Sequence, residues 1–166
     1  MKSKRRRGLP KKRQRESKTD YRKRLKLLSS RTPRLVIRRS LNNIYAQIIE
    51  YQPAGDQVLV SASTDELRKK YHTKLGRNIV SSYLTGYLLG HKALHKKISH
   101  AIADLGLQTI TKGSVLFSCL KGAVDAGLDV PHSEDAFPVH ERIQGKHLKN
   151  TIPLEQIKTK IQAEKK

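Results

Sequence analysis

The chain has 166 residues, a length typical of one domain or of one domain with tails. It holds 35 Lys and Arg against 14 Asp and Glu, so the formal net charge is +21 and a polyanionic partner is expected. The single cysteine excludes an internal disulfide and any multi-cysteine metal site. No apolar run approaches the ~20 residues that span a bilayer, so we expect a soluble protein without a membrane partner.

Most of the positive charge lies at the N-terminus. Residues 1–39 hold 18 Lys and Arg against two acids, a net +16, whereas residues 40–166 contribute +5. A run this basic cannot pack in a core, and a solvated tail or a nuclear-import patch is the simplest interpretation. We favour an arm that binds phosphates, because +16 exceeds the charge of an ordinary solvated face. The arm, residues 4–15, is expected to be disordered until RNA binds it.

The first elements expected after the arm are a short helix and three strands. Thr19 and Asp20 precede a basic helix over residues 21–28, in which Leu25 and Leu28 would supply the apolar contacts. Alternating β-branched residues then predict three strands, and the turns between them are short, so neighbouring strands must be antiparallel. The three strands are expected at residues 35–40, 44–49 and 58–63.

The pattern changes to helical spacing in the second half of the chain. A capping box at Ser63 predicts a short helix through Lys70, and a longer helix is expected over residues 79–97. Residues 100–105 form a short apolar run, which predicts a buried strand. Ser114 then caps a second amphipathic helix that stops at Gly127. The polar remainder is expected to hold short helices near residues 139–148 and 154–163.

These elements predict an α/β fold in which helices cover a mixed sheet of about four strands. Three antiparallel strands come first, followed by helix, strand and helix. A basic N-terminal arm precedes this core and a polar C-terminal extension follows it. The expected divisions are an arm with its short helix at residues 1–33, an α/β core at residues 34–130 and the extension at residues 131–166.

Six segments, taken together in order and spacing, resemble one protein family. They read T-D-Y-R-K-R-L-K-L-L from Thr19, P-R-L-V-I-R-R from Pro33, N-I-Y-A-Q-I-I from Asn43, S-Y-L-T-G-Y-L-L-G from Ser82, D-L-G-L-Q-T-I-T-K-G-S from Asp104 and G-A-V-D-A-G-L-D-V-P-H from Gly122. This resembles the archaeal form of the large-subunit ribosomal protein family L-eighteen, whose eukaryotic counterpart is L-five. The resemblance covers about residues 17–135, and the segment after residue 135 matches no family pattern.

The resemblance implies a cytoplasmic protein that binds 5S rRNA in the central protuberance of the large ribosomal subunit. It also implies contacts with large-subunit rRNA and with neighbouring ribosomal proteins, made by one copy of the chain. No catalysed reaction, cofactor or metal is expected. Two other classes stay open, namely a non-ribosomal nucleic-acid chaperone or compacting protein, and a small hydrolase with a basic tail.

The signals for enzyme or metal chemistry are weak. Residues 118–121 fit the hydrolase motif S-x-x-K without its partner motifs, and Cys119 lies on an apolar stripe that indicates a buried thiol. His91 and His95 are four residues apart, but no third metal ligand is evident. We interpret both as part of a basic patch with Lys92, Lys96 and Lys97. Gly86 and Gly90 indicate close helix packing.

The side chains expected to contact RNA are basic, amide or aromatic, and they concentrate before residue 46. Cations bind phosphates, whereas tyrosines such as Tyr45 and Tyr51 can stack on the unpaired bases of RNA loops or simply pack at a sheet edge. Arg38 and Arg39 point to opposite faces of one strand, so at least one should reach RNA. The expected RNA-binding set is Lys4, Arg5, Arg6, Arg7, Lys11, Lys12, Arg13, Arg15, Lys18, Tyr21, Arg22, Lys23, Arg24, Lys26, Arg34, Arg38, Arg39, Asn42, Asn43 and Tyr45.

Overall fold

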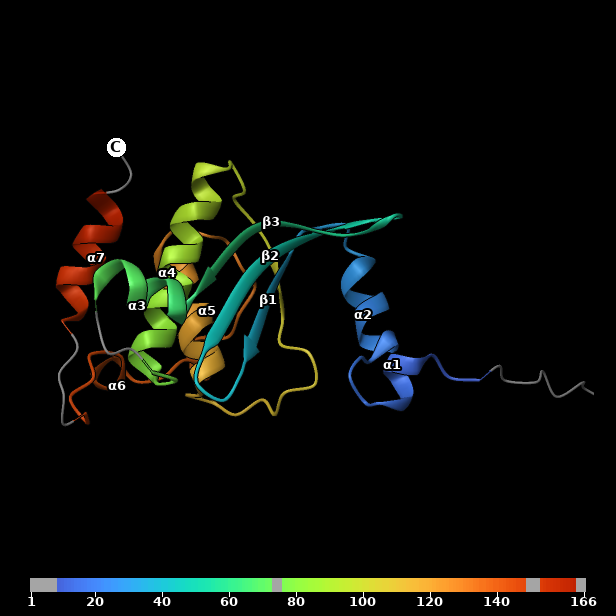
Figure 1. The fold of residues 1–166 in the computed structure, drawn as a ribbon, viewed down its shortest axis with the longest axis horizontal. Coiled ribbons are helices and arrows are strands. Elements are labelled where there is room, and N and C mark those ends of the chain that lie inside the picture. Colours follow the sequence, from blue (N-terminus) through green and yellow to red (C-terminus); the bar gives the residue numbers. More distant parts are fainter. Residues whose placement is uncertain (1–8, 73–75, 149–152, 164–166) are drawn as a thin grey trace, which may run out of the picture.

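The computed structural model describes residues 9–72, 76–148 and 153–163, and within them four strands form one sheet (Figure 1). The strand order is β3-β2-β1-β4, in which β1 and β2, and likewise β2 and β3, are antiparallel, while β4 is parallel to β1. The predicted α/β fold with a mixed sheet is therefore confirmed. The bounds are β1 Arg34–Arg39, β2 Ile44–Gln52, β3 Gly55–Ser63 and β4 Ile102–Asp104.

The two faces of the sheet differ in character because side chains alternate along each strand. In β2, Ile44 and Ile48 are fully buried on the inner face, whereas Tyr45 is 43% exposed on the outer face. The β2–β3 register shifts after Ile48, where Ile48 faces Val60 and the next β2 residue faces Val58, so β3 carries a bulge at Leu59. The outer face is therefore left for polar and aromatic groups.

Helices cover the two faces unequally. Figure 1 shows α3, α4 and α5 on one side of the sheet and α1 and α2 on the other. The cap predicted at Ser63 is formed, since its hydroxyl accepts the Glu66 N–H at 3.1 Å, and at the start of the next helix the side-chain oxygen of Asn78 accepts the Ser81 N–H at 2.7 Å. The bounds are α1 Lys12–Arg15, α2 Tyr21–Leu28, α3 Thr64–Tyr71, α4 Ile79–His95 and α5 Val115–Asp125.

One predicted cap is only half right. Ser114 occupies the N-cap position of α5, and its carbonyl accepts the Ser118 N–H at 3.0 Å, but its side chain makes no capping bond. The other end of α5 follows the prediction. Gly127 has φ +104°, its N–H donates to Val124 and the next N–H donates to Ala123, which together close a left-handed C-terminal cap.

Helix α4 lies at the centre of the core and is buried on nearly every side. Its residues from Ile79 to His91 are all buried, although helical spacing predicted only a stripe of Val80, Leu84, Leu88 and His91 with Ile79, Tyr83 and Tyr87 beside it. His91 is 8% exposed, and its ring meets Tyr87 edge-on at 4.6 Å between centroids. The predicted basic patch is therefore wrong for His91, because the sheet, α5 and α7 enclose the helix. His95, Lys96 and Lys97 remain exposed.

Helices α4 and α5 meet through glycines with almost no space between their backbones. A Cβ atom added at Gly86 would lie 1.8 Å from the Cys119 carbonyl oxygen, and one added at Gly122 would lie 2.0 Å from the Tyr83 carbonyl oxygen. At Gly90 the nearest atom, the Ala126 Cβ, would be 2.6 Å away. The predicted small-residue packing is confirmed, and it extends to Gly122.

Gly86→Ala is expected to destabilise the protein, against helix propensity. In an open helix this change would stabilise by about 1 kcal/mol, but here the new methyl group meets a helix backbone that cannot rotate away. We expect the free energy of unfolding to fall by about 1–3 kcal/mol or more, measured by urea denaturation. Gly76→Ala is the control, because a Cβ there has nothing within 4 Å. Equal stability of the two variants would contradict the close packing.

The C-terminal extension holds the two predicted helices, and it folds against α4, which the sequence did not predict. Helix α6 spans His140–Ile143 and α7 spans Leu154–Ala163, with a 3-10 turn at Glu134–Ala136 before them. Lys158 places its Nζ 4.9 Å from the centre of the Tyr83 ring. The apolar residues of α7 that pack inward are Leu154, Ile157 and Ile161.

Two lysines from the end of α4 reach the outermost strand. Lys92 Nζ donates to the Ser61 carbonyl at 3.0 Å, and Lys96 Nζ donates to the Leu59 carbonyl at 2.7 Å. Both carbonyls belong to β3, which has a neighbouring strand on one side only. Within the described ranges, none of the helices is long and apolar enough to cross a membrane.

Candidate nucleic-acid interface

Helix α2 begins as the sequence predicts but packs differently. The Asp20 carboxylate accepts the N–H groups of Arg22 at 2.9 Å and Lys23 at 3.1 Å, which confirms the cap. Leu25, expected to pack inward, is 70% exposed, and Leu28 is only half-buried. None of the residues of α2 is buried, so polar contacts rather than apolar packing hold this helix on the sheet.

The segment before α2 is more ordered than expected. Lys12–Arg15 form the one-turn helix α1, and the expectation of a disordered arm is wrong for these residues. Arg13 Nε donates to the Thr19 hydroxyl at 3.0 Å, and Lys11 Nζ lies 4.7 Å from the centre of the Tyr21 ring. The predicted RNA-binding residues Lys4, Arg5, Arg6 and Arg7 lie outside the described residues.

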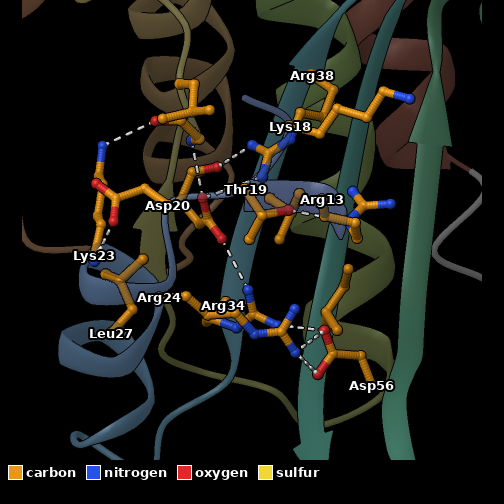
Figure 2. A pocket seen from close by; sticks show the side chains of 15 residues that line it. Arg13, Lys18, Thr19, Asp20, Lys23, Arg24, Leu27, Arg34, Arg38 and Asp56 are labelled. Atoms are coloured by element: carbon orange, nitrogen blue, oxygen red, sulfur yellow. Dashed lines mark hydrogen bonds and ion pairs between the residues drawn. The ribbon is translucent and has the colours of Figure 1, made fainter. Parts of the chain in front are cut away.

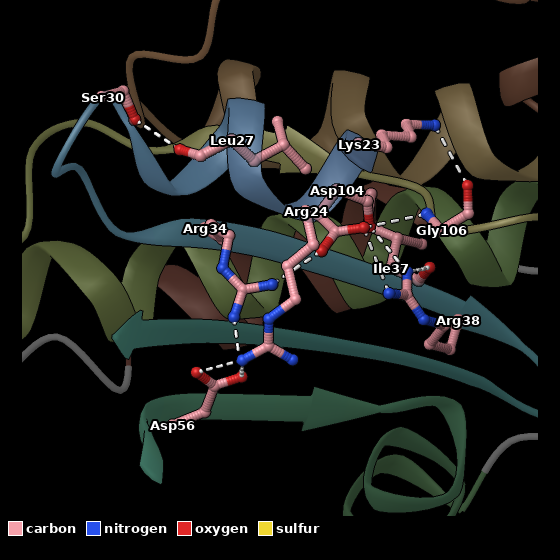
Figure 3. Close-up of polar contacts among 10 residues, drawn as sticks. All are labelled: Lys23, Arg24, Leu27, Ser30, Arg34, Ile37, Arg38, Asp56, Asp104 and Gly106. Atoms are coloured by element: carbon pink, nitrogen blue, oxygen red, sulfur yellow. Dashed lines mark hydrogen bonds and ion pairs between the residues drawn. The ribbon is translucent and has the colours of Figure 1, made fainter. Parts of the chain in front are cut away.

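An ion-pair network joins α2 to the outer face of the sheet (Figure 3). Arg34 donates through Nη1 to Asp104 and through Nη2 to Asp56, each at 2.8 Å, and its side chain is 4% exposed. Arg24 Nη2 contacts both carboxylate oxygens of Asp56 at 2.9 Å. Arg34 was expected among the RNA contacts. Its guanidinium group is buried and paired with two carboxylates, so it is not available to RNA.

Arg38 closes the other end of this network while keeping an open side. Its Nη1 donates to the Asp104 carbonyl at 2.7 Å and its Nη2 to the Asp104 carboxylate at 3.1 Å, yet the side chain stays 43% exposed. Lys23 adds a bond from its Nζ to the Gly106 carbonyl at 3.0 Å. Arg39, on the next position of β1, is exposed. Both arginines are thus within reach of a partner.

Asp104 titrates below its ordinary range. Burial by itself raises the pKa of Asp104, but the charge of Arg38 and the hydrogen bonds from Gly106, Arg38 and Arg34 outweigh it, so the pKa lies below 3.8. Because the pKa is depressed in the folded state, the stabilisation is complete above the unfolded pKa of about 4. It is lost as the pH falls through the folded value.

Asp104→Asn is accordingly expected to cost about 3 kcal/mol of unfolding free energy near neutral pH, since it leaves buried arginine charge unpaired. The difference from wild type should begin to narrow near pH 4, where Asp104 of the unfolded chain takes up a proton, and it should vanish as the pH falls through the lower folded pKa, where the native carboxylate also loses its charge. Urea denaturation at several pH values measures both effects. Asp135→Asn, at an exposed position, is the control. A difference that stays constant down to low pH would contradict the role of the Asp104 charge.

A cleft opens between the α1–α2 segment and the sheet (Figure 2). Its volume is ≈ 170 Å³, and its wall carries six cationic and three acidic side chains, a net charge of +3. The cations come from both sides, since Arg13 and Lys18 belong to the α1 region and Arg34 and Arg38 to β1. The full lining is Arg13, Lys18, Thr19, Asp20, Lys23, Arg24, Leu27, Arg34, Val36, Arg38, Ile49, Asp56, Asp104, Gly106 and Leu107.

Aromatic side chains extend the same face of the sheet. Tyr45 pairs in register with Arg38, and Tyr51 on the same strand is 53% exposed. Asn42 is exposed, whereas Asn43 is half-buried and its side-chain oxygen accepts bonds from Thr64 and Arg68. The sequence did not predict that Asp56 and Asp104 belong to the ion-pair network, nor which uncharged residues line the cleft. The segment that begins at Asp104 contributed to the family resemblance, but nothing in it indicated that Asp104 pairs with arginines.

Residues 5–103 and 95–133 match the family described as ribosomal large subunit proteins 60S L5, and 50S L18. Together these ranges span most of the 166 residues. The chain belongs to this family. It is therefore a protein of the large ribosomal subunit in the cytoplasm, and association with rRNA follows from its membership. The match ends before the C-terminal extension, which the structure nevertheless joins to the core through α7.

The residues proposed for hydrolase chemistry serve packing in this member of the family. Ser118 is fully buried, and its hydroxyl donates to the Ile79 carbonyl at 2.7 Å across the α4–α5 contact. Cys119 is also fully buried, and burial raises the pKa of its thiol to about 12. A thiol in this state is a poor nucleophile. Among the described residues, no group of three or more His, Cys, Asp and Glu could hold a metal ion.

Proposed function

We propose that this large-subunit ribosomal protein binds 5S rRNA and anchors it in the central protuberance. The observation that carries the proposal is the collection of cations and an exposed aromatic on one side of the sheet. Phosphate-binding groups of α1 and α2 lie over β1, and Tyr45 lies beside Arg38 in register. Family membership supplies rRNA as the polyanion that a net charge of +21 requires.

The two kinds of side chain have separate roles in this proposal. Cations of the arm and of α2 neutralise phosphates and set the position of the RNA, which adds affinity without reading sequence. Tyr45 stacks on an unpaired base, which duplex RNA does not offer. The phosphate-binding cations are Lys4, Arg5, Arg6, Arg7, Lys11, Lys12, Arg13, Arg15, Lys18, Arg22, Lys23, Lys26 and Arg39.

In the proposed organisation, the arm of residues 1–33 binds the RNA, and the core of residues 34–130 holds the arm in position. The C-terminal extension of residues 131–166 meets large-subunit rRNA or neighbouring ribosomal proteins through the surface that α7 leaves exposed when it packs on α4, as one copy in each ribosome. We infer no catalytic role, since the residues singled out for catalysis are buried in the contact between α4 and α5.

Tyr45→Ala should weaken binding to 5S rRNA more than binding to a control RNA of equal length. Stacking of one base on an aromatic ring contributes about 1–3 kcal/mol, so we expect a loss of roughly fivefold to a hundredfold for 5S rRNA. Filter binding at one fixed salt concentration measures it, with Tyr45→Phe as the variant that retains the ring. Wild-type protein that binds 5S rRNA, control RNA and duplex DNA equally would instead indicate a general nucleic-acid chaperone.

A further inference from the structure

The cleft under α1 and α2 has more positive charge than its own acids can neutralise. Three guanidinium groups, those of Arg24, Arg34 and Arg38, share the two carboxylates of Asp56 and Asp104. Six cations against three acids on the wall leave a net charge of +3, of which Glu16, outside the wall, neutralises one through its ion pair with Lys18 at 2.8 Å. An excess of this size inside a recess attracts a small anion, because low-dielectric walls focus the field.

Hydrogen-bond donors in the cleft also outnumber the acceptors that face them. Arg24 pairs with Asp56 through Nη2, yet 35% of its side chain remains exposed. Arg38 donates hydrogen bonds to Asp104 and to the Ile37 carbonyl, yet 43% of its side chain remains exposed. Arginine donors in this fork geometry suit the oxygens of a phosphate.

The dimensions allow such a ligand. The cleft volume of ≈ 170 Å³ is far above the ~10–15 Å³ that one water requires, so it accepts a phosphate group with several waters. The wall residues Arg13 and Lys23 come from the α1–α2 segment and Arg34 and Arg38 come from β1 (Figure 2). A ligand in the middle would touch both walls at once.

We propose that this cleft is a binding site for one phosphate group, which in the ribosome belongs to the RNA backbone. The proposal rests on the proposed function for its source of phosphate, but the site itself is defined by the protein alone. A phosphate bound here links α1 and α2 to β1 and so fixes a helix that has no buried residue of its own. Bound RNA thereby completes the attachment of the segment to the core.

The first arm of the test uses inorganic phosphate and no RNA. At constant ionic strength, phosphate should shift the backbone N–H signals of Gly106 and Lys23 in proton–nitrogen NMR, and the shifts should saturate. The double variant Arg13→Gln with Lys18→Gln should weaken this binding roughly tenfold, because hydrogen bonds to charged groups are the strong ones. The matched variant Lys146→Gln with Lys160→Gln loses the same charge from exposed positions of the C-terminal extension, outside the cleft wall. It should bind phosphate as wild type does.

Equal weakening in the two double variants, or shifts that never saturate, would overturn the phosphate site. The second arm identifies the source of the phosphate. At constant ionic strength, phosphate should compete with 5S rRNA more strongly than chloride does, and this excess should disappear in the Arg13→Gln, Lys18→Gln variant. Saturable phosphate binding without this competition would show that the cleft holds free phosphate and would overturn its assignment to RNA. Loss of preference for 5S rRNA alone would refute only the proposed function.

Discussion

Deleting residues 1–17 is expected to lower both the affinity for 5S rRNA and the dependence of that affinity on salt. Nine cations are removed by this truncation, among them Lys12, Arg13 and Arg15 of α1. Each phosphate that a protein neutralises releases counterions. The affinity of a protein with about 6–10 such contacts therefore falls by a factor of about 10³–10⁵ when the salt concentration rises from roughly 50 to 200 mM. The truncated protein should show a shallower decline over the same range.

The truncated protein should still prefer 5S rRNA to an unrelated RNA, since the shape and unpaired bases of the RNA are met by the folded core. Filter binding of both proteins across a salt series measures the two effects together. Lys146→Gln with Lys160→Gln, two exposed positions of the C-terminal extension, is the control for charge in general. An unchanged salt slope would show that the arm makes few phosphate contacts, and complete loss of preference would assign recognition to the arm itself.

Leu84→Ala should lower the free energy of unfolding by about 2–5 kcal/mol, a large part of the total stability of a domain. Leu84 is fully buried on α4, where α5 and the sheet cannot collapse into the space that its side chain leaves. Leu25→Ala on α2 is the matched control, because Leu25 is 70% exposed and should change stability little. Thermal denaturation followed by circular dichroism compares the two. A wild-type melting temperature for Leu84→Ala would contradict the central position of α4.

Local patterns predicted most of the fold because they depend on neighbouring residues. Alternating β-branched residues predicted β1 to β3, and the predicted caps Asp20 and Ser63 each accept a backbone N–H at a helix start. The side-chain bond predicted at Ser114 is not formed, although the hydroxyl is shielded from solvent. The spacing of apolar residues and the capping residues thus determine where helices and strands lie, but tertiary packing decides which of their faces is buried.

The candidate interface was harder to predict because its geometry depends on residues far apart in the chain. Arg34 pairs with Asp56, 22 residues away, and with Asp104, 70 residues away, so nothing near Arg34 marked it as buried. Helix α2 likewise reads as an amphipathic helix with inward leucines, yet ion pairs dock it and Leu25 points to solvent. Basic composition predicted the polyanionic partner, but only the fold separates cations that are free from those already paired.

The lysines at the end of α4 have a consequence for the chain when it is alone. An outermost strand with unpaired backbone groups is a template on which another chain can add a strand and start aggregation. A strand added along β3 would have to displace Lys92 from the Ser61 carbonyl and Lys96 from the Leu59 carbonyl, and it would meet two ammonium groups there. The opposite border, β4, offers only the three residues Ile102–Asp104. At these positions both borders of the sheet therefore resist the addition of another strand.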